Sequence, residues 1–335
     1  MATMSDIAAA AEVSVTTVSR VLSGRGDIPT ATRLRVTEAA NRLGYRRSDT
    51  DRGRPNRSHP RTIELVLGVF DDGWTNEVTA GARAGAASLG YDLVLTQERD
   101  DPKDDWPRRV AARRSSGVVL GLIKPSMSQL DTLRGLNIPL VLLDPSSDPA
   151  GRFESIGTTD RQGGWDVGAH LAALGHRHFI VVAGEPHFRF GRAREEGFLS
   201  AIKELAPDGE IVTVKGTWQE DDLTQTLEPV FASFPATAIF ACNDAMAAGV
   251  YKAAAQLGLR IPRDLSVVGF DDTPRYSGLS PALTTIHQPI RAMATRAVEL
   301  VQQLRNGTLV QLERIEVPTT LVVRGSTRPP RPKDH

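Results

Sequence analysis

The sequence predicts two architectures in series. A small all-α helix-turn-helix module comes first, followed by an α/β body of parallel sheets covered by helices on both faces. Three short amphipathic helices are expected within residues 1–45. From residue 62, apolar runs of strand length alternate with stretches long enough for a helix, which indicates parallel sheets. A chain of 335 residues has room for two or three domains.

The two parts carry opposite charge. Residues 1–61 contain 11 Arg and no Lys against 6 Asp and Glu, a balance of +5, and the remainder holds 29 basic and 34 acidic residues, a balance of −5. A basic head on an acidic body is typical of a nucleic-acid-binding module joined to a body that does not bind DNA itself. Charge alone equally fits a solvated arginine-rich surface, so the helices decide between the two.

The head is expected to form helices over residues 5–11, 15–22 and 30–43. In the second helix Val18, Val21 and Leu22 recur at i, i+3 and i+4 and face inward, which leaves hydroxyl side chains and an arginine outward. Ser14 precedes this helix as an N-cap. Two short helices joined by a tight turn and closed by a third form a helix-turn-helix module, whose second helix reads DNA.

Residues 46–61 are expected to form a linker, because they contain no apolar residue larger than proline and are dense in arginine. Gly53, Pro55 and Pro60 argue against a stable free helix there. Arginines in such a segment can lie along a phosphate backbone.

Polar turns follow several expected strands of the body: Asp71-Asp72, Asp144, Asn243-Asp244 and Asp271-Asp272. Open parallel sheets bind ligands beyond the carboxyl ends of their strands, so these turns are candidate binding residues. Asp and Asn also cap helices, and Asp244 is expected to cap the helix at 245–257. The expected strands are 62–70, 91–96, 117–123, 138–143, 178–183, 211–214, 237–242 and 265–270.

Several functional classes find no support in the sequence. Because no nucleophile elbow, P-loop or zinc-protease motif occurs, no enzyme or cofactor is expected. No metal is expected either, since the histidines lack metal-ligand spacing and the cluster of His170, His176, His178 and His187 is attributed to chance. The single cysteine, Cys242, fits a reducing compartment. The start carries no signal-peptide pattern and no stretch has membrane-spanning length, so a cytoplasmic protein is expected.

Residues 3–45 closely resemble the headpiece of the lactose-repressor (LacI-type) family of bacterial transcription regulators. The resemblance continues to about residue 325. Five segments of the body resemble that family in the same order: LGHRHFIVVAG (174–184), RAREEGF (192–198), IFACNDAMAAGV (239–250), RIPRDLSVVGFDD (260–272) and PALTTIHQP (281–289).

The resemblance implies a homodimer that reads a pseudo-palindromic operator in double-stranded DNA and lies on the nucleoid when bound. It also implies a periplasmic-binding-protein-like body of two doubly wound sub-domains, with a small-molecule effector in the cleft between them. The C-terminus has no heptads, which favours a dimer over a tetramer. The implied domains are a helix-turn-helix domain at 1–45, a hinge linker at 46–61 and an effector-binding and dimerisation domain at 62–330, whose sub-domains are 62–158 with 290–317 and 159–288 with 318–330.

Site residues are carried over by motif. Val15, Thr16 and Arg20 take the base-reading positions, where they suit a thymine methyl, a base edge and a guanine respectively. The matched phosphate-contacting positions are Thr3, Ser14, Thr17, Ser19 and Thr32.

In the cleft, Arg194 matches the family's effector-binding arginine, and Asp271 matches the carboxylate on the opposite wall. Trp218 matches an aromatic residue that stacks on the ligand ring. The expected set also includes Asn243, as a donor and acceptor, and Gln288. The alternatives are a structural ion pair for Arg194 and an ordinary half-buried position for Trp218.

Three positions in the head and linker depart from the family pattern. Glu12 stands where glycine is usual, and Pro29 replaces a serine cap, which leaves Asp27 or Thr30 to cap the third helix. Arg54 replaces a leucine that wedges into the minor groove. Because arginine suits a narrow A·T-rich minor groove, the linker is expected to bind DNA as an extended basic arm.

The cleft departs from the pattern as well. Asp71, Asp72 and Trp74 stand where members carry a longer loop, and they are expected to set ligand choice. Phe188 and Phe190 stand where polar residues often touch the effector, and their rings either stack on a sugar or cover the cleft mouth.

The expected function is therefore that of a sequence-specific transcriptional regulator, a repressor, controlled by a small-molecule effector. A mono- or oligosaccharide is favoured, because tryptophan, aspartate and arginine form the usual sugar-binding set. The alternatives are a purine- or nucleoside-responsive corepressor-type regulator and a solute-binding receptor. The basic head argues against the receptor.

Overall fold

The computed structural model describes residues 3–22, 28–43, 61–99, 105–123, 125–145, 153–308 and 314–331. Two compact units divide the chain at Ser58. Arg54, Asp27 and the side chain of Thr30 lie outside the described residues, as does the expected linker up to residue 60.

The first unit is the predicted helix-turn-helix module. It comprises α1 (Met4–Ala11), α2 (Val15–Leu22) and α3 (Thr30–Arg42). One residue from each helix, Ile7, Val18 and Val36, is completely buried in a shared core. The Ser14 hydroxyl accepts a hydrogen bond from the Thr17 backbone N–H at 3.1 Å, so Ser14 caps α2 as predicted.

The turn between α1 and α2 explains why glycine is usual at position 12. Glu12 has φ 52° and ψ 48°, in the left-handed region, and its backbone N–H bonds to the carbonyls of Ala8 and Ala9. A side chain at this conformation costs about 1 kcal/mol relative to glycine. Glu12 is exposed, so the side chain itself meets no clash with the core.

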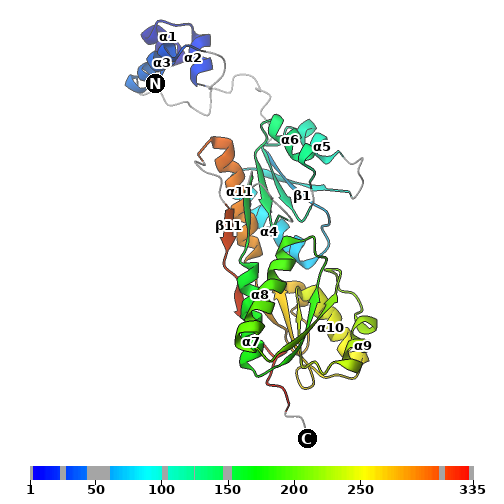
Figure 1. The fold of residues 1–335 in the computed structure, drawn as a ribbon. Helices are drawn as coiled ribbons and strands as arrows, with labels where there is room; N and C mark the ends of the chain where they lie inside the picture. Colours follow the sequence, from blue (N-terminus) through cyan, green and yellow to red (C-terminus); the bar gives the residue numbers. More distant parts are fainter. Residues whose placement is uncertain are drawn as a thin grey trace. The chain divides into compact units, whose positions relative to one another are not determined.

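The second unit contains two six-stranded sheets, each with helices on both faces (Figure 1). The first sheet is entirely parallel, in the order β11-β5-β4-β3-β1-β2. Helices α4 and α11 pack on one face, and α5 and α6 on the other. The elements of this sub-domain are β1 (Thr62–Leu67), α4 (Gly73–Ser88), β2 (Asp92–Gln97), α5 (Trp106–Arg113), β3 (Gly117–Gly121), α6 (Met127–Gly135), β4 (Leu140–Leu143), β5 (Glu154–Thr158), α11 (Ile290–Asn306) and β11 (Arg314–Val317).

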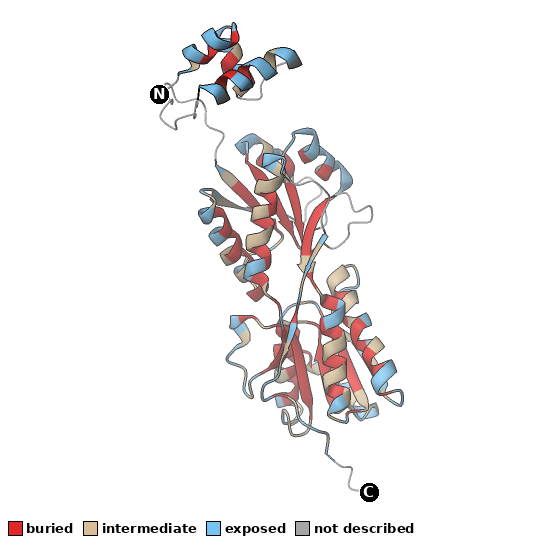
Figure 2. Cartoon of the chain, turned by 90° about the vertical axis from the view of Figure 1, so that its left-hand side faces the viewer, coloured by how far each residue is buried: buried red, intermediate tan, exposed pale blue. Residues whose placement is uncertain are grey.

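The second sheet has the order β12-β10-β9-β8-β6-β7, and its one antiparallel pair is β10 with β12. Its inner strands β6, β8 and β9 are buried on both faces, which accounts for their continuous apolar runs, and Figure 2 shows buried strands in the middle of the sheet. The elements are α7 (Asp160–Ala173), β6 (His178–Ala183), α8 (Arg189–Leu205), β7 (Glu210–Lys215), α9 (Thr224–Ser233), β8 (Ala238–Ala241), α10 (Asp244–Gln256), β9 (Ser266–Asp271), the 3-10 helix η1 (Pro274–Tyr276), β10 (Thr284–His287) and β12 (Thr320–Val322).

The chain passes between the two sheets three times: from β5 to α7, from β10 to α11, and from β11 to β12. These crossings bring the carboxyl ends of β1 and β4 opposite those of β6, β8 and β9. The two sub-domains therefore face each other across the ends where a parallel sheet binds ligand.

All eight predicted strands are present, but β5, β10, β11 and β12 were not predicted. The sequences ESIGT and TTIH are rich in small polar residues, and β11 and β12 are only four and three residues long. The first strand also ends at Leu67, three residues before the predicted end, and Gly68 and Val69 then line a cavity. Within the described residues, no helix has the length and apolar character needed to cross a membrane.

His176 ties the C-terminal segment to the second sheet and predicts a pH dependence of stability. Its ring bonds to the Thr237 hydroxyl at 2.8 Å and to the Arg328 carbonyl at 3.0 Å, and burial lowers the pKa of His176 to about 4. An unfolded histidine titrates near 6.5, so the unfolded state binds a proton first as pH falls. The His176 contribution is thus complete above pH 6.5 and is lost toward pH 4.

Between pH 7.5 and pH 5 we expect a loss of about 2 kcal/mol. Urea unfolding at pH 7.5, 6 and 5 measures it as the difference between the wild type and His176→Asn. His178→Asn, on β6, is the control and keeps the wild-type slope. Parallel stability curves for the wild type and His176→Asn would contradict the assignment.

Candidate DNA-binding helix and ligand cleft

Helix α2 presents its expected base-reading residues to solvent. Val15 is 45% exposed, and Thr16, Ser19 and Arg20 are exposed as well, whereas Val18 is buried. An apolar side chain at 45% exposure has no role in the core of the module and is available to a thymine methyl. The helix therefore has one face that builds the core and one that suits the major groove.

Four of the five expected phosphate-contacting residues lie at the starts of helices, and the fifth, Ser19, is exposed in the middle of α2. Thr3 and Asp6 form a capping box at α1, in which the Thr3 hydroxyl accepts from the Asp6 N–H. The hydroxyls of Ser14 and Thr17 lie 2.9 Å apart at the start of α2. Thr32, in the first turn of α3, is half-buried. N-terminal turns present free N–H groups, which favour phosphate.

In the second unit, a cavity of about 280 Å³ lies between the two sub-domains. Two predicted residues line it from the first sub-domain, Asp72 and Trp74. From the second sub-domain come Phe188, Phe190, Arg194, Trp218, Asn243 and Asp271. Asp71 and Gln288 are not among the lining residues.

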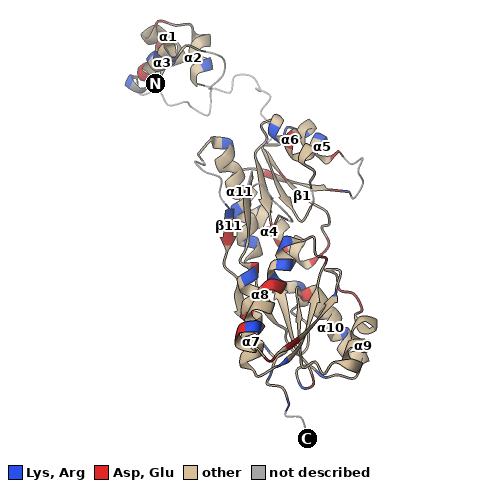
Figure 3. Cartoon of the chain, in the orientation of Figure 1, with Lys and Arg blue, Asp and Glu red and all other residues tan. Residues whose placement is uncertain are grey.

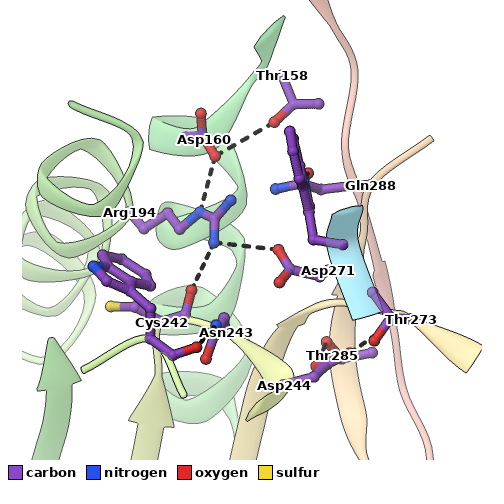
Figure 4. A network of polar contacts seen from close by, with 12 residues as sticks. Thr158, Asp160, Arg194, Cys242, Asn243, Asp244, Asp271, Thr273, Thr285 and Gln288 are labelled. Carbon is purple, nitrogen blue, oxygen red and sulfur yellow. Dashed lines mark hydrogen bonds and ion pairs between the residues drawn. The ribbon is translucent and has the colours of Figure 1, made fainter. Parts of the chain in front are cut away.

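Arg194 is the centre of the polar network in the cleft (Figure 4). It is 2% exposed, and its Nε donates to Asp160 at 2.9 Å. Its Nη1 donates to the Cys242 carbonyl at 2.7 Å and forms an ion pair with Asp271 at 3.3 Å. The guanidinium carbon also lies 3.8 Å from the centre of the Phe270 ring. The structural ion pair is thus present, and the same side chain lines the cavity.

Three buried carboxyl groups share this single guanidinium. Burial and the neighbouring charge of Asp160 together raise the pKa of Asp144 to about 8, against the opposing effect of Arg194. Burial likewise raises the pKa of Asp271 well above its usual value, again opposed by Arg194. The buried carboxyl groups therefore compete for the charge of Arg194, and two of them, Asp144 and Asp271, present oxygens to the cavity.

Aromatic rings form a wall of the cavity next to Arg194. The centre of the Trp218 ring lies 4.9 Å from that of Phe190 and 6.0 Å from that of Phe188. Phe190 also lies 5.0 Å from the guanidinium carbon of Arg194. The two phenylalanines thus pack with the tryptophan and line the cavity, so they are part of the wall.

The structure corrects the assignment of Asp244 as a helix cap. Asn243 is the N-cap of α10, since its Oδ1 accepts from the Met246 N–H at 2.8 Å, and its Nδ2 donates to the Trp218 carbonyl at 3.0 Å. Asp244 is buried instead, where it accepts from the Thr285 hydroxyl at 2.6 Å and from the Thr273 N–H at 3.0 Å. Asn243 therefore positions the tryptophan and the helix at the cavity wall.

Gln288 and Asp71 lie outside the set of residues that line the cavity. The Trp74 indole N–H donates to the Gln288 Oε1 at 3.3 Å, and the Nε2 of Gln288 is buried with no hydrogen-bond partner among the described residues. Asp71 is exposed, and its neighbour Asp72 caps α4 through the Thr75 N–H at 2.7 Å. Of the three residues expected to set ligand choice, only Asp72 and Trp74 line the cavity.

Sequence analysis missed Asp160, Glu185 and Tyr276. Asp160 pairs with Arg194, and Glu185 and Tyr276 line the cavity. Asp160 follows β5, a strand that the sequence pattern did not reveal, so no strand end pointed to it. Asp144 follows β4 as a predicted polar turn and does line the cavity.

The position of Trp218 depends on two glycines. A Cβ added at Gly184 would lie 1.9 Å from the indole Cε2, and one at Gly191 would lie 2.5 Å from its Cη2. We expect Gly184→Ala to displace the indole, lower the free energy of unfolding by about 1–3 kcal/mol, and weaken ligand binding. Urea unfolding and ligand titration of the variant measure both effects. Gly135→Ala is the control, since its Cβ would meet nothing within 4 Å; equal ligand affinity in the two variants would contradict the role of the glycines.

Both the helix-turn-helix module and the α/β body are similar to known proteins. Residues 3–48 match the bacterial regulatory proteins of the lacI family, and residues 169–327 match a periplasmic binding protein-like domain. The HTH-type transcriptional repressor PurR of Yersinia pestis (strain Pestoides F) is 30% identical over an alignment of 335 positions, which covers 97% of each chain. The lac repressor dimer bound to operator and the anti-inducer ONPF is similar with a TM-score of 0.71 and 27% identity, over 98% of this chain and 99% of that one. A CelR–cellobiose complex is similar with a TM-score of 0.71 and 25% identity, over 97% of this chain and 100% of that one.

The helix-turn-helix module and the ligand cleft together define a DNA-binding transcriptional regulator with an effector-binding domain. The chain belongs to the LacI family of bacterial regulatory proteins.

Proposed function

We propose that the protein is a repressor that binds its operator as a homodimer and is controlled by a sugar in the cleft between the sub-domains. The observation that carries the proposal is that a carboxylate–guanidinium cluster and an aromatic wall lie side by side in one cavity of about 280 Å³. Sugar hydroxyls bond to carboxylate and guanidinium groups, while the C–H face of a sugar ring packs on an aromatic ring.

We assign the site residues as follows. Arg194 and Asp271 bind hydroxyl groups, Trp218 with Phe188 and Phe190 packs on the ring, and Asp72 and Trp74 contact the ligand from the first sub-domain. In the head, Val15, Thr16 and Arg20 read bases. The domain boundaries at residues 45, 61 and 158–159 belong to the same proposal, as does action in the cytoplasm on the nucleoid.

Several solved relatives support a sugar, since their names state bound cellobiose or ribose. A purine-responsive regulator is the second candidate, because the relative of 30% identity is the repressor PurR. The aromatic wall also suits a planar base, whereas the buried carboxyl cluster favours a ligand with several hydroxyl groups.

A thermal-shift screen of mono- and disaccharides and of nucleobases tests the effector class. A ligand at roughly 100 times its dissociation constant stabilises the folded protein by about 2.7 kcal/mol. We expect a sugar to raise Tm in the wild type and to have no effect on Asp271→Asn, with Asp92→Asn on the exposed start of β2 as the charge-matched control. If only nucleobases raise Tm, the effector is a base and the proposal of a sugar is wrong. If a sugar still raises Tm in Asp271→Asn, the assignment of the binding site to this cavity is wrong.

A further inference from the structure

A second and larger cavity, of about 890 Å³, lies at the opposite end of the first sheet from the effector cleft. It is formed by the loops that precede β3 and β4, by the start of β5 and by the end of α11. These are the amino ends of parallel strands, whereas the cleft lies at the carboxyl ends. The polar residues that line it include Arg114, Ser115, Ser116, Arg134, Asn137 and Arg305.

Three exposed arginines give this edge a positive charge. Arg134 lies with its guanidinium carbon 4.8 Å from the centre of the Phe153 ring, and Arg305 donates to the Ser116 carbonyl at 3.2 Å. Arg114 ends α5 in a left-handed conformation. Glu154 is the acidic residue among the described residues that line the cavity, and it is only 8% exposed. Figure 3 shows basic segments on α5 and α6 and at the end of α11.

The chain itself connects this edge to the DNA-binding module. Ser116 donates its backbone N–H to the Thr62 carbonyl at 2.7 Å, so the cavity borders the start of β1. Thr62 is the first residue of β1 and directly follows the arginine-rich segment 46–61. The basic edge is therefore the part of the body to which the linker is attached.

We propose that the basic edge formed by Arg114, Arg134 and Arg305 binds the phosphodiester backbone of the DNA that the headpiece recognises. Guanidinium groups spread around a wide cavity suit successive phosphates along a strand, whereas a single small anion requires them to converge on one point. Residues 62–335 carry a net charge of −5. This net charge does not prevent the interaction, because salt screens distant charges and phosphate binding depends on the arginines at the basic edge. These arginines add affinity without reading sequence.

Salt dependence of binding by the full chain tests the proposal. The probe is a duplex of about 40 base pairs that carries the operator selected by the protein from random sequence, and fluorescence anisotropy gives K between about 50 and 300 mM salt. The slope of log K against log salt decreases in magnitude by about 0.9 for each phosphate that the protein no longer neutralises. For each protomer in which the arginines bind phosphate, we expect Arg114→Gln to reduce its magnitude by about 0.9, and the triple variant with Arg134→Gln and Arg305→Gln to reduce it by about 2.7.

The charge-matched control is the triple variant Arg83→Gln, Arg161→Gln and Arg260→Gln, whose arginines are exposed and lie outside this cavity. It keeps the wild-type slope if the proposal is correct. Equal slopes in the two triple variants would overturn it, while retained operator preference would leave the regulator function intact. Stabilisation by inorganic phosphate that disappears in the Arg114 triple variant, with an unchanged DNA slope, would also overturn it in favour of a free anion. Arg114→Gln alone tests the interaction if the triple variant does not fold.

Discussion

Arg194→Ala is expected to lower the free energy of unfolding by about 3–5 kcal/mol and to abolish effector binding. Arg194 is buried, and its guanidinium faces Asp160 and Asp271 at 2.9 and 3.3 Å. Its removal leaves buried carboxylates without a counter-charge, and this costs more than the pair itself contributes. Urea unfolding at pH 7.5 and ligand titration measure the two effects.

The pH dependence of the Arg194→Ala deficit separates this cause from a packing defect. Without the guanidinium, the pKa values of the buried carboxyls rise further, so protonation at low pH neutralises them. The deficit relative to wild type should therefore shrink between pH 8 and pH 5. Arg192→Ala, an exposed arginine on the same helix, should cost under about 0.5 kcal/mol. A deficit that stays constant with pH would contradict the electrostatic account.

Arg20→Ala is expected to weaken operator binding by about 1–3 kcal/mol, or roughly 5- to 150-fold, and to relax sequence preference at one base pair. Arg20 lies on the exposed face of α2, opposite the buried Val18. A bidentate arginine–guanine contact supplies discrimination between bases as well as affinity. Binding to a panel of operators that differ at single positions measures both.

Arg35→Ala is the matched control, because it removes the same charge from an exposed position on α3 of the same module. A purely electrostatic contribution weakens binding to every operator equally. If Arg20→Ala behaved in this way, with its base preferences unchanged, Arg20 would be a phosphate contact and would no longer count as a base reader.

The fold was predictable where the pattern is strong. The three helices of the head and eight strands of the body follow from apolar periodicity, and the polar turns after β1, β4, β8 and β9 contribute residues to the cavity. The strands that were missed lie next to the crossings, where short polar segments such as TTIH become strands only through pairing with a neighbour. Tertiary context supplies that pairing, and local sequence does not encode it.

The polar network was less predictable than the fold. The family motif indicated Arg194 and Asp271, but Asp160 joins them through a chain crossing that brings residues 160, 194 and 271 together. Asn243 lines the cavity as expected but also takes the helix-cap role that was expected of Asp244, which instead accepts hydrogen bonds from Thr273 and Thr285. Either residue type can cap a helix, so only the packed structure decides which one does.

The central claim is that a ligand in the cleft controls binding of the headpiece to DNA. Operator affinity measured with and without the ligand identified by thermal shift, for the wild type and for Asp271→Asn, tests it most directly. The account predicts that the ligand changes operator affinity by about 5- to 150-fold in the wild type and has no effect in Asp271→Asn, whose ligand-free affinity equals that of the wild type. An operator affinity that is unchanged by the bound ligand in the wild type, or changed equally in both proteins, would contradict the claim.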